Sequence, residues 1–408
     1  MSEPVSPLAP DRFPDLPAIA GVRALTASLG LYKTTRDDLI LLALDEGTSV
    51  AGAFTKSLTA SADVNWCREN LPRGAARALV CNAGNSNAFT GFAGIEKNLA
   101  TAATAAKLAS CHPEEIFLAA TGVIGQPLPP RRVADHLADL WPKLAAPDWQ
   151  KLARAFMTTD TFPKGAGATC AIGGKQVNIA GIAKGSGMIA PNMATMLVFI
   201  FTDAALAPAC AQALINRHLG DTFNSITVDG DTSTSDTILL FSTAKSGAPL
   251  ISDADDPRLA AFSAGLKDVM FDLALQVVRD GEGAQKLIRI AITSAQSEES
   301  ARRIGLSIAN SPLVKTAIAG GDANWGRIVM AVGKAYEPIN IDKLAIKFGG
   351  TLVANGGAVP YDEGPVDAHV RTRKVEIEVD VGIGAGAATI WTCDLTDGYI
   401  RINGDYRS

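Results

Sequence analysis

The sequence has few residues of the kinds that form covalent or metal cross-links. It contains six cysteines and four histidines among 408 residues. No cysteines have a CxxC spacing and no histidines form an HExxH pattern, which argues against a disulfide framework and a zinc site. The aspartates of 225–237 lack the register of a calcium loop. We expect reduced core cysteines and no metal, although spacing alone leaves the pair Cys111-His112 open.

Basic clusters and long hydrophobic runs are also missing. Lysine and arginine number 37 against 42 acidic residues, so the net charge is 37 minus 42, or -5. No basic patch interleaved with aromatics offers a track for phosphates, so a nucleic-acid partner is not expected. The first twenty residues carry five prolines and no apolar signal region. The apolar run 196–201 is far too short to cross a bilayer. We expect a cytoplasmic protein with no membrane partner.

Hydrophobic residues, in contrast, are plentiful. They make up 47% of the chain, enough for two or three domains or one large interleaved α/β body. Periodicity predicts helices at 98–110, 131–144, 148–157, 205–219, 257–278 and 298–310. Strands are predicted at 39–44, 49–54, 76–81, 116–120, 168–172, 175–180, 196–201, 238–242, 286–292, 345–348, 375–381, 388–393 and 399–402.

The stretch 184–203, KGSGMIAPNMATMLVFIFTD, joins a polar Gly-rich loop to a buried strand. It places Thr195 at the start of that strand. A threonine hydroxyl is a weak nucleophile, and it can be activated if the threonine becomes a chain N-terminus whose α-amine accepts the proton. This chemistry requires cleavage between Ala194 and Thr195. The ordinary alternative is that Thr195 is simply a β-branched strand residue.

Four other residues are of types that suit a reaction site. Thr121 and Gly122 directly follow the predicted strand 116–120, and their hydroxyl and backbone N–H would suit an oxyanion hole, although Thr-Gly after a strand is usually a turn. Lys184 could pair a substrate carboxylate as a mobile point charge. Glu282 lies between two glycines, where a carboxylate has little packing purpose and can enter a cleft.

Several segments resemble one known family. KGSGMIAPNMATML, in the stretch 184–197, closely resembles the self-processing site of the ornithine acetyltransferase (glutamate N-acetyltransferase) family, in which cleavage before the threonine exposes the nucleophile. NAGNSNAFTG at 82–91 is similar to a family loop, with Phe89 where a small or sulfur-bearing residue is expected. TTDT at 158–161 is also a family segment. The similar segments run from about residue 51 to 408 and leave the proline-rich leader unexplained.

The resemblance implies an α/β protein with the DmpA/ornithine acetyltransferase-like fold. This fold is of the self-cleaved N-terminal-nucleophile type, with layered sheets and helices. Residues 1–194 would form an alpha chain with the oxyanion and substrate loops. Residues 195–408 would form a beta chain with the N-terminal threonine nucleophile and a C-terminal substrate-binding segment. Two alpha and two beta chains would assemble as a heterotetramer.

The resemblance also implies residue roles. The catalytic residues would be Thr195 as nucleophile and Thr121 and Gly122 as oxyanion donors. Cleavage would separate Ala194 from Thr195. Substrate would contact Thr158, Lys184, Thr195, Glu282, Asn403 and Ser408. Thr159 and Thr161 are close enough in the sequence to remain alternatives to Thr158.

The implied reaction is an acetyl exchange in the cyclic pathway of arginine biosynthesis. Acetyl passes from N2-acetyl-L-ornithine to L-glutamate through an acyl-threonine, giving L-ornithine and N-acetylglutamate without a metal or organic cofactor. Some family members also use acetyl-CoA, and the sequence leaves this open. One alternative is an N-terminal-nucleophile aminopeptidase or amidase of the same fold, and another is a non-catalytic binding or assembly protein. Lys184, Glu282 and Asn403 favour an amino-acid substrate and so the transferase.

Overall fold

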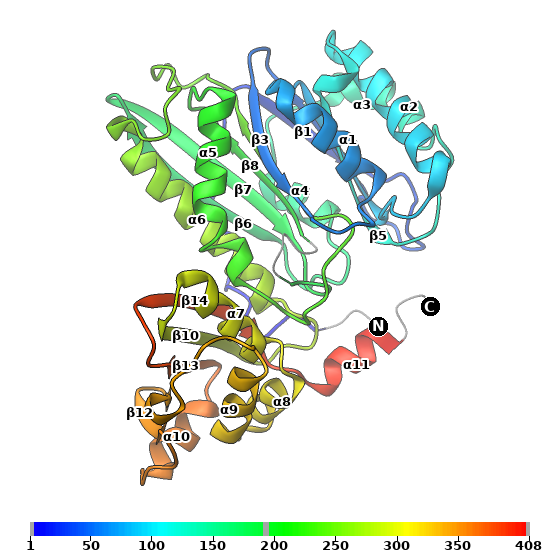
Figure 1. The fold of residues 1–408 in the computed structure, drawn as a ribbon. Helices are drawn as coiled ribbons and strands as arrows, with labels where there is room; N and C mark the ends of the chain where they lie inside the picture. The colour runs from blue at the N-terminus through cyan, green and yellow to red at the C-terminus, as the bar shows by residue number, and fades with distance from the viewer. Residues whose placement is uncertain (1–3, 191–195, 405–408) are drawn as a thin grey trace.

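Three β-sheets organise the chain. The structure is a computed structural model that describes residues 4–190 and 196–404. The first sheet has the strand order β1-β2-β4-β5, the central sheet β3-β9-β8-β7-β6, and the third sheet β12-β11-β13-β10-β14. The first and central sheets stack together, and the third sheet lies below them with its own helices (Figure 1). The predicted α/β class with layered sheets and helices is confirmed.

The first sheet is covered by helices on its outer face. Its strands are β1 (Val22–Ala27), β2 (Leu39–Leu44), β4 (Ala78–Asn85) and β5 (Ile116–Val123). One face of β2, β4 and β5 packs against α2 (Gly91–Ala109) and α3 (Ala134–Leu140). The opposite face packs against the central sheet, in a core that also takes in α1 (Ala62–Asn70) and α4 (Trp149–Ala155).

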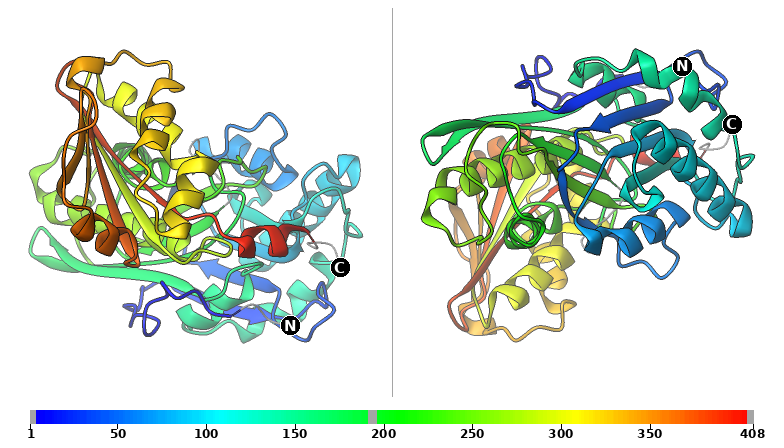
Figure 2. Two further views of the ribbon diagram at one scale, coloured as in Figure 1. Left: turned by 90° about the horizontal axis from the view of Figure 1, so that it is seen from below. Right: turned by 90° about the horizontal axis from the view of Figure 1, so that it is seen from above.

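The central sheet is buried on both faces. Its strands are β3 (Ser49–Phe54), β6 (Lys164–Ile172), β7 (Lys175–Lys184), β8 (Leu197–Thr202) and β9 (Thr237–Ser242). Side chains alternate across a strand. Leu197, Phe199 and Phe201 of β8 therefore pack toward the first sheet, and Val198 and Ile200 pack toward α5 (Pro208–Leu219) and α6 (Ala260–Arg279). Helix, two sheets and helix thus form four layers (Figure 2).

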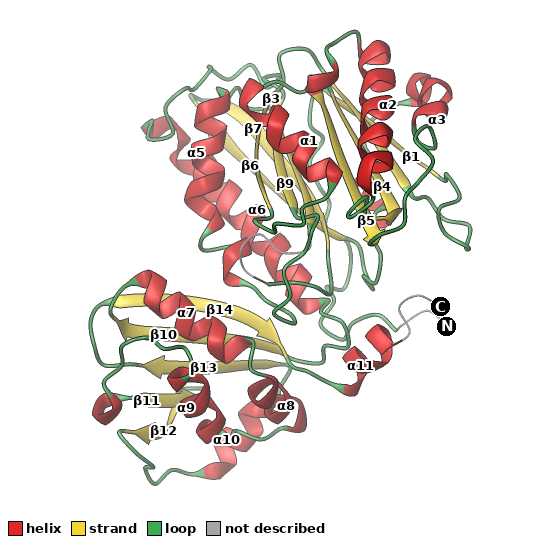
Figure 3. Cartoon of the chain, turned by 45° about the vertical axis from the view of Figure 1, so that its right-hand side comes forward, coloured by secondary structure: helices red, strands yellow, loops and turns green. Residues whose placement is uncertain are grey.

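The third sheet has a separate core made by its own helices. Its strands are β10 (Leu287–Ala295), β11 (Ala345–Phe348), β12 (Thr351–Asn355), β13 (Lys374–Asp380) and β14 (Gly386–Cys393). The helices that share this core are α7 (Glu298–Ala309), α8 (Pro312–Gly320), α9 (Trp325–Gly333) and α10 (Glu363–Val370). The last helix, α11 (Asp397–Gly404), leaves this sheet and runs beneath the stacked sheets (Figure 3).

Most predicted strands are confirmed, and some to the residue. β2 and β3 occupy exactly the predicted 39–44 and 49–54, although they enter different sheets. β6 and β7 form the predicted hairpin over Gly173 and Gly174, whose φ angles of 57° and 79° are those of a left-handed two-residue turn. The sequence prediction missed β1, β12, α1, α8, α9 and α10.

Several predicted elements differ in type or extent, and three of these differences concern the predicted site. The segment 399–402, predicted as a strand, lies in α11, because the Thr396 hydroxyl accepts from Gly398 N at 3.2 Å and turns the chain into a helix before any strand edge is reached. β5 continues through Thr121 and Gly122 to Val123. β7 continues to Lys184, beyond its predicted end at residue 180, because it keeps pairing with β8 to that point.

Candidate active site

A cavity of about 300 Å³ gathers most of the predicted site residues. They come from β5, from the loop after α4, from the end of β7, from the loop after α6 and from α11. The lining includes Thr121, Gly122, Thr158, Lys184, Glu282 and Asn403. Ala194, Thr195 and Ser408 lie outside the described residues. Lys184 pairs with Leu197 in the strand register, so the chain enters β8 beside this cavity.

Gly122 lies where two parallel strands come unusually close. Its φ is +131°, which L-residues with a side chain rarely adopt. A Cβ at this position would be 2.5 Å from the carbonyl carbon of Gly84 on β4. The β4–β5 register is irregular at Gly84 and Asn85, so a bulge in the ladder falls beside the predicted oxyanion pair. The chain therefore needs glycine at Gly122 for reasons of backbone geometry alone.

Lys184 is held in place rather than mobile, which corrects the sequence expectation of a mobile point charge. Its side chain is 4% exposed. Nζ donates to Thr121 Oγ1 at 3.2 Å and lies 4.0 Å from Asp160 Oδ2. Burial lowers the pKa of Lys184, and the Asp160 carboxylate partly opposes this shift.

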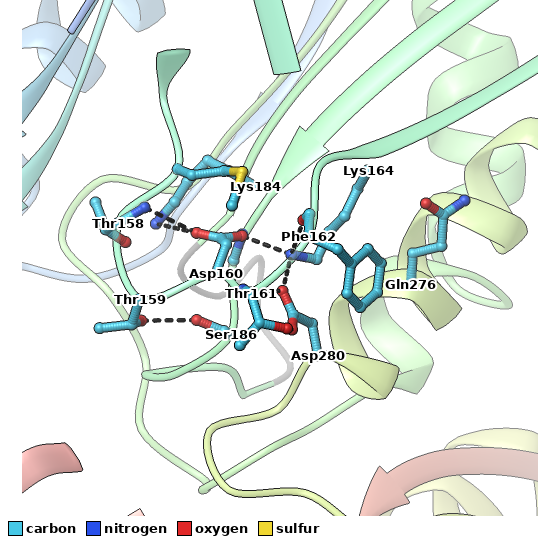
Figure 4. A network of polar contacts seen from close by, with 12 residues as sticks. Thr158, Thr159, Asp160, Thr161, Phe162, Lys164, Lys184, Ser186, Gln276 and Asp280 are labelled. Carbon is cyan, nitrogen blue, oxygen red and sulfur yellow. Dashed lines mark hydrogen bonds and ion pairs between the residues drawn. The ribbon is translucent and has the colours of Figure 1, made fainter. Parts of the chain in front are cut away.

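Asp160 connects the Thr158 loop to the end of β7. Its Oδ2 accepts from Thr158 N at 3.0 Å, and its Oδ1 accepts from Gly185 N at 2.7 Å and from Lys164 Nζ at 2.6 Å (Figure 4). Lys164 Nζ also donates to Asp280 Oδ2 at 2.5 Å. Burial alone would raise the pKa of Asp160, but the charges of Lys164 and Lys184 outweigh burial and lower it.

The three threonines of the TTDT segment have different surroundings. Thr158 and Thr159 line the cavity, and the Thr159 hydroxyl bonds to Ser186 Oγ at 2.7 Å. Thr161 instead directs its hydroxyl to Asp280 and accepts from Ser6 N at 2.9 Å. Thr158 and Thr159 therefore remain candidates for substrate contact. Thr161 instead makes hydrogen bonds within the protein, to Asp280 and Ser6.

Glu282 and Asn403 meet in the cavity lining. Asn403 Nδ2 donates to Glu282 Oε2 at 2.6 Å. The Glu282 N–H donates to Ser186 O at 2.9 Å, and its carboxyl group lies against Gly187, where a Cβ would come within 2.4 Å. Burial raises the pKa of Glu282, and its hydrogen bond to Asn403 partly offsets this shift. The close glycine leaves room for the carboxyl group at the cavity surface.

Two aspartates of the tract 225–237 also support the site, and the sequence assigned them no individual role. Asp229 accepts from the backbone N–H of Met188 at 2.6 Å and of Ile189 at 2.9 Å. Asp236 Oδ1 accepts from the backbone N–H of Met196 at 2.9 Å, and Met196 is the first residue described after residue 190. Burial raises the pKa of Asp236. The only sequence signal was their position in a hydroxyl-rich tract next to a buried strand.

The described residues offer little for other kinds of site. Within 4–190 and 196–404, no group of three or more histidine, cysteine or acidic side chains could hold a metal ion. All six cysteines are free, and Cys111 and His112 are not among the cavity residues. No helix in these ranges is both long and apolar enough to span a membrane.

Comparisons with known proteins agree on one family. The ArgJ family profile matches residues 23–408. The chain is 54% identical over 413 residues to the "arginine biosynthesis bifunctional protein ArgJ" of Agrobacterium fabrum and 55% identical to that of Bradyrhizobium diazoefficiens, each covering 100% of both chains.

Two solved structures are also similar. The ArgJ structure from Bacillus halodurans is 36% identical with a TM-score of 0.48, covering 50% of this chain and 96% of that one. The ornithine acetyltransferase of Mycobacterium tuberculosis, complexed with ornithine, is 30% identical with a TM-score of 0.38, covering 43% of this chain and 93% of that one.

Proposed function

Because the chain belongs to the ArgJ family, we propose that it transfers acetyl from N2-acetyl-L-ornithine to L-glutamate in arginine biosynthesis. The products are L-ornithine and N-acetylglutamate. The observation that carries the proposal is the single cavity in which Thr121, Gly122, Lys184, Glu282 and Asn403 meet beside the entry to β8. Carboxyl, ammonium and amide groups in one cavity suit a substrate that carries both charges of an amino acid.

The first half of the reaction forms an acyl-enzyme. Thr195 Oγ attacks the acetyl carbonyl carbon, and its proton passes to the α-amine of the same residue. The hydroxyl of Thr121 and the N–H of Gly122 donate to the oxygen that becomes negative. The bond from carbon to the ornithine nitrogen then breaks, and the proton moves from the α-amine to that nitrogen. Ornithine leaves, and acetyl remains on Thr195.

The second half reverses these steps with glutamate. The glutamate nitrogen attacks the acetyl carbon and gives up a proton to the α-amine of Thr195. The bond from Oγ to carbon breaks, and the proton returns to Oγ. Lys184 pairs the substrate carboxylate, Glu282 pairs its free ammonium group, and Thr158, Asn403 and Ser408 supply polar contacts. The exchange needs no metal and no organic cofactor.

The nucleophile becomes available through cleavage. The Thr195 hydroxyl attacks the Ala194 carbonyl in an N-to-O acyl shift, and hydrolysis of the ester releases an alpha chain of residues 1–194 and a beta chain of residues 195–408. Two copies of each form a cytoplasmic heterotetramer, by analogy with the family. Acetyl-CoA is a second donor, weaker than acetylornithine, since the described cavity offers charges complementary to an amino acid, and its described lining includes no glycine-rich loop that leads into a helix N-terminus and could bind a pyrophosphate.

Ornithine release with and without glutamate tests the proposal. Without glutamate we expect one equivalent of ornithine per cleaved enzyme and then a stop, because acetyl stays on Thr195. With glutamate we expect continuous release and an equal amount of N-acetylglutamate. Continuous release of ornithine and acetate at a rate that glutamate does not change would instead identify an amidase. No ornithine at all would identify a non-catalytic protein.

A further inference from the structure

Lys184 contacts a residue that its role in binding substrate does not require. Its Nζ donates to Thr121 Oγ1 at 3.2 Å, and both side chains are buried. Lys184 ends β7 of the central sheet, whereas Thr121 lies in β5 of the first sheet. The stacking of the two sheets therefore brings the ammonium group against the hydroxyl that is placed to donate to the oxyanion.

The direction of this hydrogen bond determines where the threonine hydrogen can point. A lysine ammonium can only donate, and a threonine hydroxyl has one hydrogen and two acceptor lone pairs. The Thr121 oxygen is therefore the acceptor, and its own hydrogen is directed to another group. Among residues 4–190 and 196–404, the structure shows no bond donated by this hydroxyl. Since Thr121 lines the cavity, the space in front of it is open to a reacting oxygen.

Asp160 keeps the lysine in this position. Three donors hold its carboxylate, namely Lys164 Nζ at 2.6 Å, Gly185 N at 2.7 Å and Thr158 N at 3.0 Å. Oδ2 of this fixed carboxylate lies 4.0 Å from Lys184 Nζ. Both side chains of this ion pair are nearly inaccessible, with exposed fractions of 0% for Asp160 and 4% for Lys184. The lysine has little freedom to leave Thr121.

We propose that Lys184 is a positioning residue for the oxyanion hole, acting through Thr121. Its ammonium group fixes the hydroxyl with the hydrogen toward the cavity and polarises it, so that Thr121 becomes a stronger donor. Hydrogen bonds in a chain strengthen one another in this way. The inference rests on the proposed function, since it needs an acetyl oxygen at Thr121. It adds a role to the contact between Lys184 and the substrate carboxylate.

A double-mutant cycle with Lys184→Met and Thr121→Val separates the two roles. Positioning affects the transition state, so Lys184→Met should lower kcat roughly 10- to 100-fold, and loss of its contact with the substrate carboxylate should also raise KM. Thr121→Val should lower kcat about 100-fold. In the double variant, loss of the lysine should cost no more than about a further twofold, because the hydroxyl through which it acts is already gone. Rates are expressed per cleaved molecule, as determined from intact mass.

Two outcomes would overturn the inference. One is a double variant whose loss equals the product of the two single losses. The other is a Lys184→Met variant with a raised KM and an unchanged kcat, as a carboxylate contact alone would give. In either case glutamate-dependent transfer by the wild type would leave the proposed function standing, whereas its absence would remove both.

Matched variants guard against a folding defect. Lys175→Met changes an exposed lysine at the other end of β7 and should leave kcat and KM unchanged. Lys184→Arg keeps donors near Thr121 and should retain more of kcat than Lys184→Met. If the methionine variant does not fold, Lys184→Leu, which also has no donor, replaces it in the cycle. An arginine variant no better than the methionine or leucine variant would also contradict the inference.

Discussion

At the scale of single residues, Glu282 shows how burial adjusts a charge for substrate binding. Its carboxyl group is largely buried, accepts from Asn403, and lies near Asp229 and Lys184. Burial penalises the ionised form, and the neighbouring Asp229 adds to the penalty, so the pKa of Glu282 is raised. A substrate ammonium group entering the cavity would supply the opposite charge. The carboxylate is therefore costly in the free enzyme and favoured in the complex.

We predict an acid limb in the activity of the free enzyme that belongs to Glu282. The ionised form binds the ammonium group, so kcat/KM for acetylornithine should fall as the pH drops through the pKa of Glu282. Because that pKa is raised, the fall should begin at a higher pH than an ordinary glutamic acid gives. Glu282→Gln should remove this limb, leave the separate fall at higher pH that protonation of the Thr195 α-amine causes, and lower kcat/KM roughly 30-fold, equivalent to about 2 kcal/mol. Steady-state kinetics from about pH 4 to about pH 8 measures the pH profile and the size of kcat/KM for the wild type and the variant. This range begins near the pKa of an ordinary carboxyl group and extends above it, as a raised pKa requires.

An exposed glutamate gives the control for this prediction. Glu46 lies in the turn after β2 and is exposed, so Glu46→Gln should leave the pH profile unchanged. The assignment of the limb is wrong if Glu282→Gln keeps the acid limb of the wild type.

At the scale of secondary-structure elements, a buried ion network joins β6, the Thr158 loop and α6. Lys164 on β6 lies between Asp160 and Asp280, and the three side chains have no exposed area. Asp280 also accepts from the backbone N–H of Thr161 at 2.9 Å. The network therefore fixes the loop that carries Thr158 and, through Gly185, the loop that follows Lys184.

We predict that Lys164→Met destabilises the protein strongly. It would leave the buried carboxylate of Asp280 without its cation and Asp160 with only Lys184 at 4.0 Å, and breaking a buried pair in this way typically costs about 3 to 5 kcal/mol. Thermal unfolding at a fixed protein concentration should show a large fall in Tm, whereas Lys175→Met should change Tm little. Adding Asp280→Asn to Lys164→Met should recover part of the loss. A Tm within about 1 °C of the wild type would contradict this account, since 1 kcal/mol alone shifts Tm by several degrees.

The sequence predicted an element well where the local residue pattern is sufficient, and poorly where distant parts of the chain decide the structure. β2, β3 and β9 are short apolar runs between turn residues, so their positions were predictable. Their sheet partners were not, because β3 pairs with β9 and β2 with β4 only through the tertiary fold. α11 was mistaken for a strand because Tyr399, Ile400 and Ile402 favour strands locally, whereas the turn at Thr396 begins a helix.

The candidate site was predictable in a similar, partial way. Thr121, Lys184 and Glu282 were singled out by loop position and by resemblance, and the fold brings them to one cavity. The ion network was not predicted, because Lys164 and Asp280 are 116 positions apart and nothing in either local sequence indicates the pairing. The bond between Lys184 and Thr121 was missed for the same reason.

At the scale of the whole molecule, the proposed cleavage falls between adjacent strands of one sheet. β7 precedes residue 195 and β8 follows it, and the two pair over six residue positions from Ile179↔Thr202 to Lys184↔Leu197. β3 and β9 pair across the same boundary. The alpha and beta chains would thus share the central sheet and its cores on both faces. They should stay associated after cleavage without a disulfide, since the six cysteines are free.

The central claim is that a freed Thr195 carries the acetyl group, and intact-mass measurement of the enzyme tests it most directly. Protein mixed with acetylornithine and quenched should give two chains, 1–194 unmodified and 195–408 heavier by one acetyl group, and glutamate should remove that group. Thr195→Ala should remain one unmodified chain, and Thr195→Ser should still cleave more slowly, because it keeps a hydroxyl. A fully active wild type that is uncleaved, or that never carries acetyl on the 195–408 chain, would contradict the account.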